Sequence, residues 1–231
     1  MNVQEATTRR LPDLKGRYLP ENCRETINTI LKETYGYEQF RNLEIYDDLS
    51  KGKEKLCISQ GQLIENVILE AEKAWKGETQ VDNILLTAPT GSGKSLLFQL
   101  PAIYLGKEYN LLTIVVSPLK ALIVDQVESL QELGYMRVAY ASSDLSPEQK
   151  MEVYRQVREG EIDLFYLSPE LLLSYDIKHF VGERRIGLVV VDEAHTVTTW
   201  GKEFRVDYWF LGRYLTALKQ TLGYNFPLFA L

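Results

Sequence analysis

One segment of the sequence joins two apolar runs through a turn that contains glycine. It covers residues 83–100 and reads NILLTAPTGSGKSLLFQL. The first run has the residues and length of a strand, and the second has those of a helix. A strand that passes through a glycine turn into a helix is the first half of a βαβ unit. The segment therefore favours a fold built on a parallel sheet.

The rest of the chain repeats this alternation of strand-like and helix-like runs. The further predicted strands, apolar enough to be buried on both faces, are LLTIVVS, RVAYA, IDLFYLS and GLVVVDE. The predicted crossover helices are KSLLFQLPAIYL, LKALIVDQVESLQEL and SPEQKMEVYRQVREG. Gly134 ends the second of these helices, and Ser146 and Pro147 open the third. We expect an α/β domain with a doubly wound, mostly parallel sheet flanked by helices.

The region before the first strand has a different character. It contains the predicted helix CRETINTILKETYG, the charged stretch DDLSKGKEK and the helical pattern QLIENVILEAEKAW. We expect residues 1–60 to form a helical N-terminal extension. Residues 61–231 are expected to form the α/β domain.

Composition limits the classes of protein that remain. With 231 residues, of which 45% are hydrophobic and 25% charged, the chain suits one sizeable globular domain with an extension. Its formal net charge of -6 disfavours a purely electrostatic nucleic-acid binder, so such binding needs a local patch. Cys23 and Cys57 lie far apart in the sequence and indicate neither a disulfide framework nor a zinc site. Because no signal peptide or long apolar run is present, we expect a cytoplasmic protein that does not contact a membrane.

The glycine turn has the pattern of a phosphate-binding loop, with Ala88 where the general pattern has glycine. Gly91 and Gly93 can adopt backbone conformations that point N–H groups at phosphate oxygens, and the start of a helix adds partial positive charge. Lys94 is expected to reach the β- and γ-phosphates, and Ser95 to bind Mg²⁺. The candidate nucleotide-binding residues of the loop are Thr90, Gly91, Ser92, Gly93, Lys94 and Ser95.

A second chemical signal ends a predicted strand, in the sequence VVDEAH. Open α/β sheets bind their ligands at the carboxyl ends of strands. Asp192 suits the coordination shell of Mg²⁺, and Glu193 can orient the water that attacks the γ-phosphate and accept its proton. Together with the loop, these carboxylates predict a nucleotide hydrolase.

These motifs, with others along the chain, resemble the first RecA-like lobe of RecQ-family superfamily 2 DNA helicases over about residues 35–231. The likeness is carried by YGYEQFR, APTGSGKSLLFQLPA, VVSPLKALIVDQV, YLSPELLL, VVDEAH and TWGKEFRVDY. The resemblance implies a RecA-like P-loop NTPase domain with ATP and Mg²⁺ as cofactors. It also implies an ATP-dependent DNA helicase that, at full length, couples ATP hydrolysis to single-stranded DNA binding and 3'-5' unwinding.

The segment TWGKEFRVDYWF looks like the aromatic-rich loop by which RecQ proteins couple single-stranded DNA to ATP hydrolysis. Aromatic rings stack on unpaired bases of any sequence, and cationic side chains meet the backbone. The resemblance implies this role for Trp200, Phe204 and Arg205. A loop leaving the VVDEAH strand can report DNA occupancy to Glu193 and His195, which join Lys94 as candidate catalytic residues. A different, core-facing role in a following helix is favoured for Tyr208, Trp209 and Phe210.

In YGYEQFR the family likeness assigns Tyr37 and Arg41 to the two faces of the adenine base. Three residues after the arginine the family has glutamine, whereas this chain has Glu44, whose carboxylate cannot pair with both the donor and the acceptor of adenine. After an apparent insertion at about residues 42–59, Gln62 lies before a helix much as the family glutamine does. We favour Gln62 over Gln60 for this role.

The family's DNA path runs along VVSPLKAL and YLSPELLL. Ser117, Lys120 and Ser168 are therefore candidate phosphate contacts. Lys120 is equally well explained as a solvated lysine at the start of a helix, and His179 is expected to be structural. The implied partner is single-stranded or partly duplex DNA.

After FPLFAL the family continues into a coupling motif and a second RecA-like lobe. We therefore expect this chain to be the first lobe, truncated before the coupling motif, and to hydrolyse ATP near background by itself. Two alternatives remain open. One is a double-stranded DNA translocase or defence-system ATPase of the same superfamily, and the other is a stand-alone nucleotide-dependent regulatory module.

Overall fold

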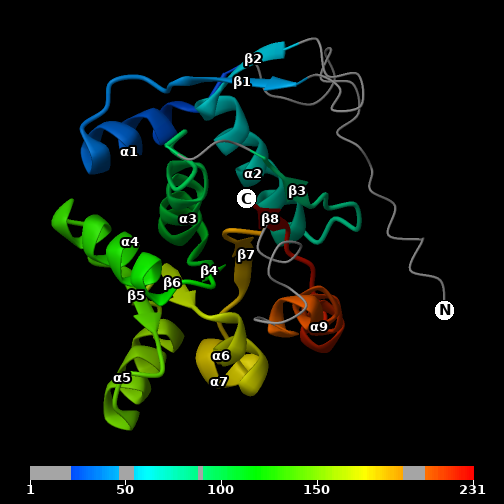
Figure 1. The fold of residues 1–231 in the computed structure, drawn as a ribbon. Coiled ribbons are helices and arrows are strands. Elements are labelled where there is room, and N and C mark those ends of the chain that lie inside the picture. The colour runs from blue at the N-terminus through cyan, green and yellow to red at the C-terminus, as the bar shows by residue number, and fades with distance from the viewer. Residues whose placement is uncertain (1–21, 47–54, 88–90, 195–205) are drawn as a thin grey trace.

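The computed structural model describes residues 22–46, 55–87, 91–194 and 206–231. Within them, six strands form one parallel sheet in the order β3-β8-β7-β4-β6-β5 (Figure 1). The strands are β3 (Ile84–Leu85), β4 (Leu112–Val116), β5 (Val138–Ala141), β6 (Leu164–Leu167), β7 (Ile186–Val191) and β8 (Leu228–Ala230). The predicted parallel sheet is confirmed.

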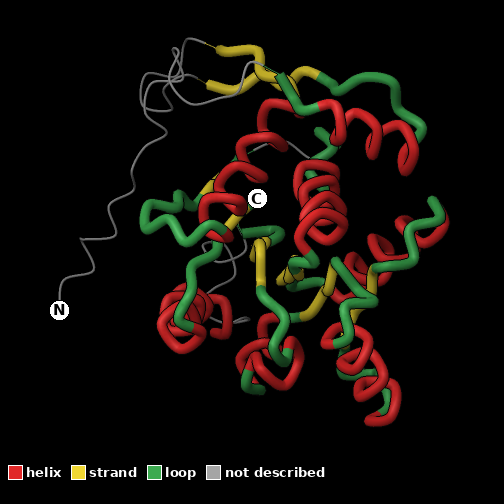
Figure 2. Tube along the Cα trace, turned by 180° about the vertical axis from the view of Figure 1, so that it is seen from behind, coloured by secondary structure: helices red, strands yellow, loops and turns green. Residues whose placement is uncertain are grey.

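Helices pack on both faces of this sheet, as Figures 1 and 2 show from opposite sides. One face is covered by α1 (Glu25–Tyr35), α2 (Gln60–Trp75), α3 (Leu96–Tyr109) and α4 (Lys120–Glu132). The other is covered by α5 (Pro147–Arg158), α6 (Pro169–Ser174), α7 (Ile177–Val181) and α9 (Val206–Leu222). The predicted doubly wound arrangement is therefore confirmed. Every helix among the described residues is too short or too polar to cross a bilayer.

The central strands are buried on both faces. In β4, Leu112, Ile114 and Val116 pack toward α5, α6, α7 and α9, whereas Val115 packs toward α1–α4. This two-sided burial explains why the strands are apolar runs and do not alternate with polar residues. Burying one such side chain stabilises the fold by about 1.5–3 kcal/mol.

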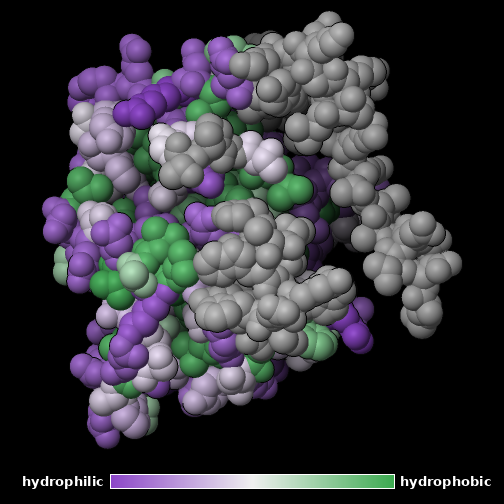
Figure 3. Space-filling model, in the orientation of Figure 1, coloured by the Kyte–Doolittle hydropathy of each residue, from purple (hydrophilic) through white to green (hydrophobic). Residues whose placement is uncertain are grey.

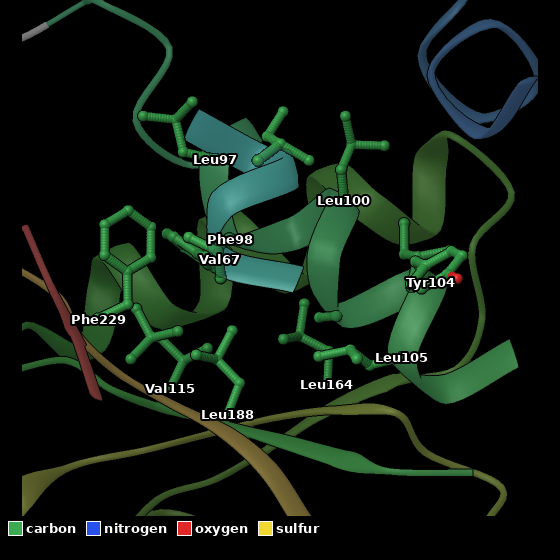
Figure 4. Close-up of a cluster of buried hydrophobic side chains, with 14 of the residues drawn as sticks. Val67, Leu97, Phe98, Leu100, Tyr104, Leu105, Val115, Leu164, Leu188 and Phe229 are labelled. Atoms are coloured by element: carbon green, nitrogen blue, oxygen red, sulfur yellow. The ribbon is translucent and has the colours of Figure 1, made fainter. Parts of the chain in front are cut away.

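Helix α3 lies at the centre of the first face, and residues 97–106 of it are all buried. Figure 4 shows Phe98 of α3 and Val67 of α2 beside the strand side chains Val115 and Leu188. Because α3 begins directly after the glycine turn, this packing fixes the turn relative to the sheet.

The N-terminal region contributes more than helices. A two-stranded antiparallel hairpin, β1 (Asn42–Tyr46) and β2 (Lys55–Ser59), precedes α2, and its register pairs Asn42 with Ser59. Our prediction of a helical extension missed this hairpin, which coincides with the apparent insertion. Helix α1 shares the main core through Ile27, Ile30 and Leu31.

Arg24 ties the start of α1 to the two helices beside it. Its guanidinium donates to Glu65 Oε1 at 2.5 Å and to Glu72 Oε1 at 2.6 Å, both on α2. It also lies 4.8 Å from the ring centroid of Tyr104 on α3. The extension is therefore held to the domain by a partly buried ionic cluster as well as by apolar packing.

The stripe of α9 that faces the sheet consists of Leu211, Leu215 and Leu218, which are spaced as one face of a helix. Phe210 precedes this stripe by one position and is 47% exposed. Our expectation that Phe210 faces the core is wrong, because one residue along a helix turns the side chain by about 100°. The side chains of Tyr208 and Trp209 lie outside the described residues.

A buried ionic cluster closes the amino-terminal end of the sheet. The Asp163 carboxylate, fully buried before β6, accepts hydrogen bonds from Arg137 Nε at 2.6 Å and Arg184 Nη2 at 2.9 Å. It also accepts one from the Tyr135 hydroxyl at 2.9 Å. Burial lowers the pKa of Arg184, although the charge of Asp163 opposes this change.

We predict that Asp163→Ala lowers the free energy of unfolding by about 3–5 kcal/mol, because it leaves two guanidinium groups without their buried counter-ion. Urea unfolding followed by circular dichroism measures this loss. Arg155→Ala is the control, because Arg155 pairs with exposed Glu152, Glu159 and Glu161. Its urea concentration at half unfolding should hardly change. Equal losses in the two variants would contradict the prediction.

Candidate nucleotide site and nucleic-acid face

Residues from four separate motifs meet at the carboxyl ends of the strands. The phosphate loop follows β3, Ser117 follows β4, Ser168 follows β6, and Asp192 and Glu193 follow β7 (Figure 1). Because all these strands are parallel, their carboxyl ends share one edge of the sheet. The fold thus gathers side chains that lie far apart in the sequence.

The phosphate loop depends on two glycines with left-handed backbone. Gly91 has a φ of 80° and Gly93 a φ of 75°, and a Cβ atom at Gly93 would lie 2.7 Å from Gln60 Nε2. Ser95 occupies the N-cap position of α3, so the loop ends where the helix N–H groups point outward. A side chain at either position would strain the left-handed backbone, and at Gly93 its Cβ would also displace the Gln60 amide.

The hydroxyl of Ser92, inside this loop, is buried and has no hydrogen-bond partner among the described residues. A buried hydroxyl without a partner is costly unless a ligand satisfies it. A phosphate oxygen bound by the loop would do so. Thr90, which was predicted to bind nucleotide, lies outside the described residues.

Asp192 lies buried at the centre of the site. Burial raises the pKa of its carboxyl, and the charge of Glu193 raises it further, while the Glu193 N–H, Lys94 and Gln126 act in the opposite sense. A bound cation would favour the ionised form of such a group. Ser95 and Asp192, which were predicted to bind Mg²⁺, carry oxygen atoms of the kind that suit this cation, which takes few protein ligands and completes its shell with phosphate oxygens and water. Their role as ligands stays a prediction.

Glu193 follows Asp192 in a strained turn. Its φ of 52° is left-handed, which non-glycine residues rarely adopt. Hydrogen bonds hold the turn at both ends, from Asp192 N–H to Val116 O at 2.9 Å and from Ala194 N–H to Leu231 O at 2.7 Å. The carboxylate predicted to activate water is therefore carried by a turn that is pinned to β4 and to the end of β8.

Gln60 joins the loop to the predicted base-binding segment. Its buried side chain accepts from the Arg41 N–H at 3.1 Å and donates to Ser92 O at 3.1 Å. The side chain of Gln62 instead accepts from the Ser59 N–H at 3.0 Å, in a capping box at the start of α2. From the sequence SQGQ alone, the link made by Gln60 and the helix cap made by Gln62 could not be told apart. Which amide meets adenine stays a prediction.

The two residues predicted to flank the base are both exposed. Tyr37 is 52% exposed and stacks on Tyr35, with ring centroids 6.3 Å apart and planes 17° apart. Arg41 directly precedes β1. A hollow of about 1020 Å³ lies beside this segment, with Phe40, Ser59 and Gln62 in its wall.

The predicted phosphate contacts to DNA are engaged within the protein. Ser117 donates to Asp192 Oδ2 at 3.4 Å, and the Ser168 side chain accepts from Leu171 N–H at 3.3 Å at the start of α6. Lys120 forms an exposed ion pair with Asp144. Figure 3 shows apolar side chains gathered over α4, at whose start Lys120 lies. The contacts with DNA stay predictions. Four further predicted residues lie outside the described ones, namely His195, Trp200, Phe204 and Arg205.

Comparison with known proteins identifies the family. Residues 64–223 match the family model of the DEAD/DEAH box helicases. The chain belongs to this family. It is 34% identical over 202 residues to the ATP-dependent DNA helicase RecQ of Synechocystis, and this match covers 87% of this chain and 35% of that protein. It is 32% identical over 180 residues to the Bacillus subtilis RecQ, and this match covers 78% of this chain and 25% of that protein. The predicted likeness to RecQ helicases is confirmed, and the chain spans only a quarter to a third of these relatives.

Solved structures support the same fold. The helicase MrfA bound to DNA superposes with a TM-score of 0.57 at 21% identity, covering 93% of this chain and 27% of that one. The yeast DEAD-box splicing factor Prp28 superposes with a TM-score of 0.58 at 15% identity, covering 91% of this chain and 46% of that one. At these identities the likeness shows the fold alone, and it confirms the predicted RecA-like domain.

For this member of the DEAD/DEAH box helicase family, we predict that Glu193→Gly is more stable than Glu193→Ala by about 1 kcal/mol. Neither variant keeps the carboxylate, so the difference reports the cost of the left-handed backbone set against the greater entropy of glycine in the unfolded chain. Urea unfolding of both variants measures it. The same pair at Glu128, an exposed position within α4, is the control, and there alanine should be the more stable by about 1 kcal/mol. The same sign at both positions would contradict the strain at Glu193.

Proposed function

We propose that this chain is the ATP-binding lobe of a RecQ-like DNA helicase that couples ATP hydrolysis to single-stranded DNA binding and 3'-5' unwinding in the full-length protein. The observation that carries the proposal is the meeting of the phosphate loop with buried Asp192 at one edge of the sheet. The relatives that match most of this chain are named ATP-dependent DNA helicases. A second RecA-like lobe and DNA are the proposed partners.

ATP is proposed to bind through its phosphates first. Gly91, Ser92 and Gly93 present backbone N–H groups, together with the Ser92 hydroxyl, which has no partner in the described part of the chain. Lys94 adds positive charge. Ser95 and Asp192 would hold Mg²⁺, which neutralises charge that develops on the phosphate oxygens. The base would stack between Tyr37 and Arg41, with Gln62 reading its edge.

Glu193 is proposed to orient the attacking water and to take its proton. The strained turn restricts the position of this carboxylate, so the attacking water would bind at a place that is fixed before the nucleotide arrives. His195 and the loop that carries Trp200, Phe204 and Arg205 are proposed to report DNA occupancy to this turn. DNA would also pass Ser117, Lys120 and Ser168.

Two variants separate nucleotide binding from hydrolysis. Lys94→Ala should weaken ATP binding by at least about tenfold, because the β- and γ-phosphates lose their cationic partner. Glu193→Gln should keep the affinity within about twofold while it removes the general base. Calorimetry with ATP and Mg²⁺ measures both affinities. Unchanged affinity in Lys94→Ala would refute the proposed site, and a protein with a second lobe that hydrolyses ATP normally as Glu193→Gln would refute the proposed base.

The ion pair of Lys120 with Asp144 offers a test of the DNA path. Asp144→Asn should raise the affinity for single-stranded DNA about twofold to threefold at low salt, because Lys120 is released to meet phosphate. Fluorescence anisotropy with a labelled oligonucleotide measures this. Asp125→Asn removes the same charge from the exposed face of α4 and should have a smaller effect. A gain that persists when Lys120 is also changed to alanine would place the contact elsewhere.

A further inference from the structure

Four hydrogen bonds form a continuous chain through the core beneath the candidate site. The Tyr35 hydroxyl donates to Gln99 Oε1 at 2.9 Å, and Gln99 Nε2 donates to the Tyr166 hydroxyl at 3.3 Å. The Tyr166 hydroxyl donates to Gln126 Oε1 at 3.0 Å, and Gln126 Nε2 donates to Asp192 Oδ2 at 3.4 Å. We call these five residues the polar relay. They come from five different segments, namely α1, α3, β6, α4 and the turn after β7.

The relay is unusual for its surroundings. Gln99, Tyr166, Gln126 and Asp192 are buried, and Tyr166 lies within the apolar core between α3 and the sheet. Apolar side chains would fill this space without polar groups that must be satisfied. Stability alone therefore gives no reason for two amides and a hydroxyl here.

The hydrogen bonds of the relay all run in one direction. Each amide accepts with its oxygen on the Tyr35 side and donates with its nitrogen on the Asp192 side. Hydrogen bonds that point in one direction polarise one another. This series ends on the Asp192 carboxylate, which is the strongest hydrogen-bond acceptor in the relay. The relay thus directs its last and most polarised N–H at one oxygen of Asp192.

The two ends of the relay meet different parts of the proposed nucleotide site. At one end Tyr35 stacks on exposed Tyr37, which is proposed to hold the base. At the other end is Asp192, the proposed Mg²⁺ ligand. Its Oδ2 accepts hydrogen bonds from Gln126 and Ser117, and its Oδ1 accepts one from the Glu193 N–H.

We propose that Gln126, held in place by Tyr166, is a positioning residue that orients the Asp192 carboxylate toward Mg²⁺, and that the relay links this orientation to the base-binding segment through Tyr35. The inference rests on the proposed function, since it requires a nucleotide with Mg²⁺ at this site. Gln126 touches neither of them and acts through Asp192. Groups that orient a metal ligand typically change metal affinity by about 10-fold to 100-fold when removed.

The test compares two tyrosine-to-phenylalanine variants of the chain. Tyr166→Phe removes a hydroxyl that holds Gln126, whereas Tyr154→Phe removes a buried hydroxyl that has no partner among the described residues. Calorimetry with a non-hydrolysable ATP analogue gives each affinity in saturating Mg²⁺ and in EDTA. The ratio of the two affinities is the Mg²⁺ enhancement, and the affinity in EDTA reports the rest of the pocket.

Tyr166→Phe should lower the Mg²⁺ enhancement about tenfold and leave the affinity in EDTA within about twofold of the unchanged protein. Tyr154→Phe should change neither quantity. Gln126→Met, which keeps the length of the side chain but not its hydrogen bonds, should repeat the loss and decides the matter if Tyr166→Phe does not fold. Tyr35→Phe, at the far end, should lower the enhancement by about twofold.

An unchanged Mg²⁺ enhancement in Tyr166→Phe and Gln126→Met would overturn the inference and leave the proposed function in place. Equal losses with and without Mg²⁺ would also overturn it, because they would show a merely structural role. An unchanged enhancement in Tyr35→Phe alone would overturn the link to the base-binding segment. If the unchanged protein binds no nucleotide, the proposed function fails, and the inference fails with it.

Discussion

The parallel sheet is buried on both faces, and this burial decides where polar chemistry can lie. Strands β4, β6 and β7 pack against helices on both faces, so polar and charged side chains lie at the strand ends. One buried aspartate lies at each end. Asp163 meets two guanidinium groups that cancel its charge, whereas Asp192 accepts from the neutral Gln126 and Ser117. Neutral donors orient a carboxylate without cancelling its charge, which suits the proposed role of Asp192 as a ligand of Mg²⁺.

A strained residue lies at the end of the sheet where the candidate site lies. Glu193 is left-handed and is held there by hydrogen bonds that reach β4 and Leu231. Such strain persists only where the surrounding structure over-determines it. A shift of β8 relative to β7 would therefore act directly on the turn that carries the proposed base, so the turn joins the geometry of the sheet to the chemistry of the site.

The parts that the sequence predicted are those dictated by local chemistry. The glycine turn, the buried strands and the carboxylates after β7 follow from residue types within short segments, and the structure brings them together. The hairpin that begins at Asn42 was missed because its pairing spans residues that looked like a charged linker. The role of Tyr166 was missed because it lies in the apolar run IDLFYLS, and its partners Gln99 and Gln126 are 67 and 40 residues away.

Long-range polar contacts of this kind also explain how the extension becomes part of the domain. Arg24 meets Glu65 and Glu72 beside α1, and Tyr35 at the end of the same helix enters the relay. Helix α1 is therefore held at its first turn by charge and at its last turn by a hydrogen bond that continues to Asp192. Because the proposed base-binding residues follow α1 directly, their position is set by the same helix that the relay connects to the metal side of the site.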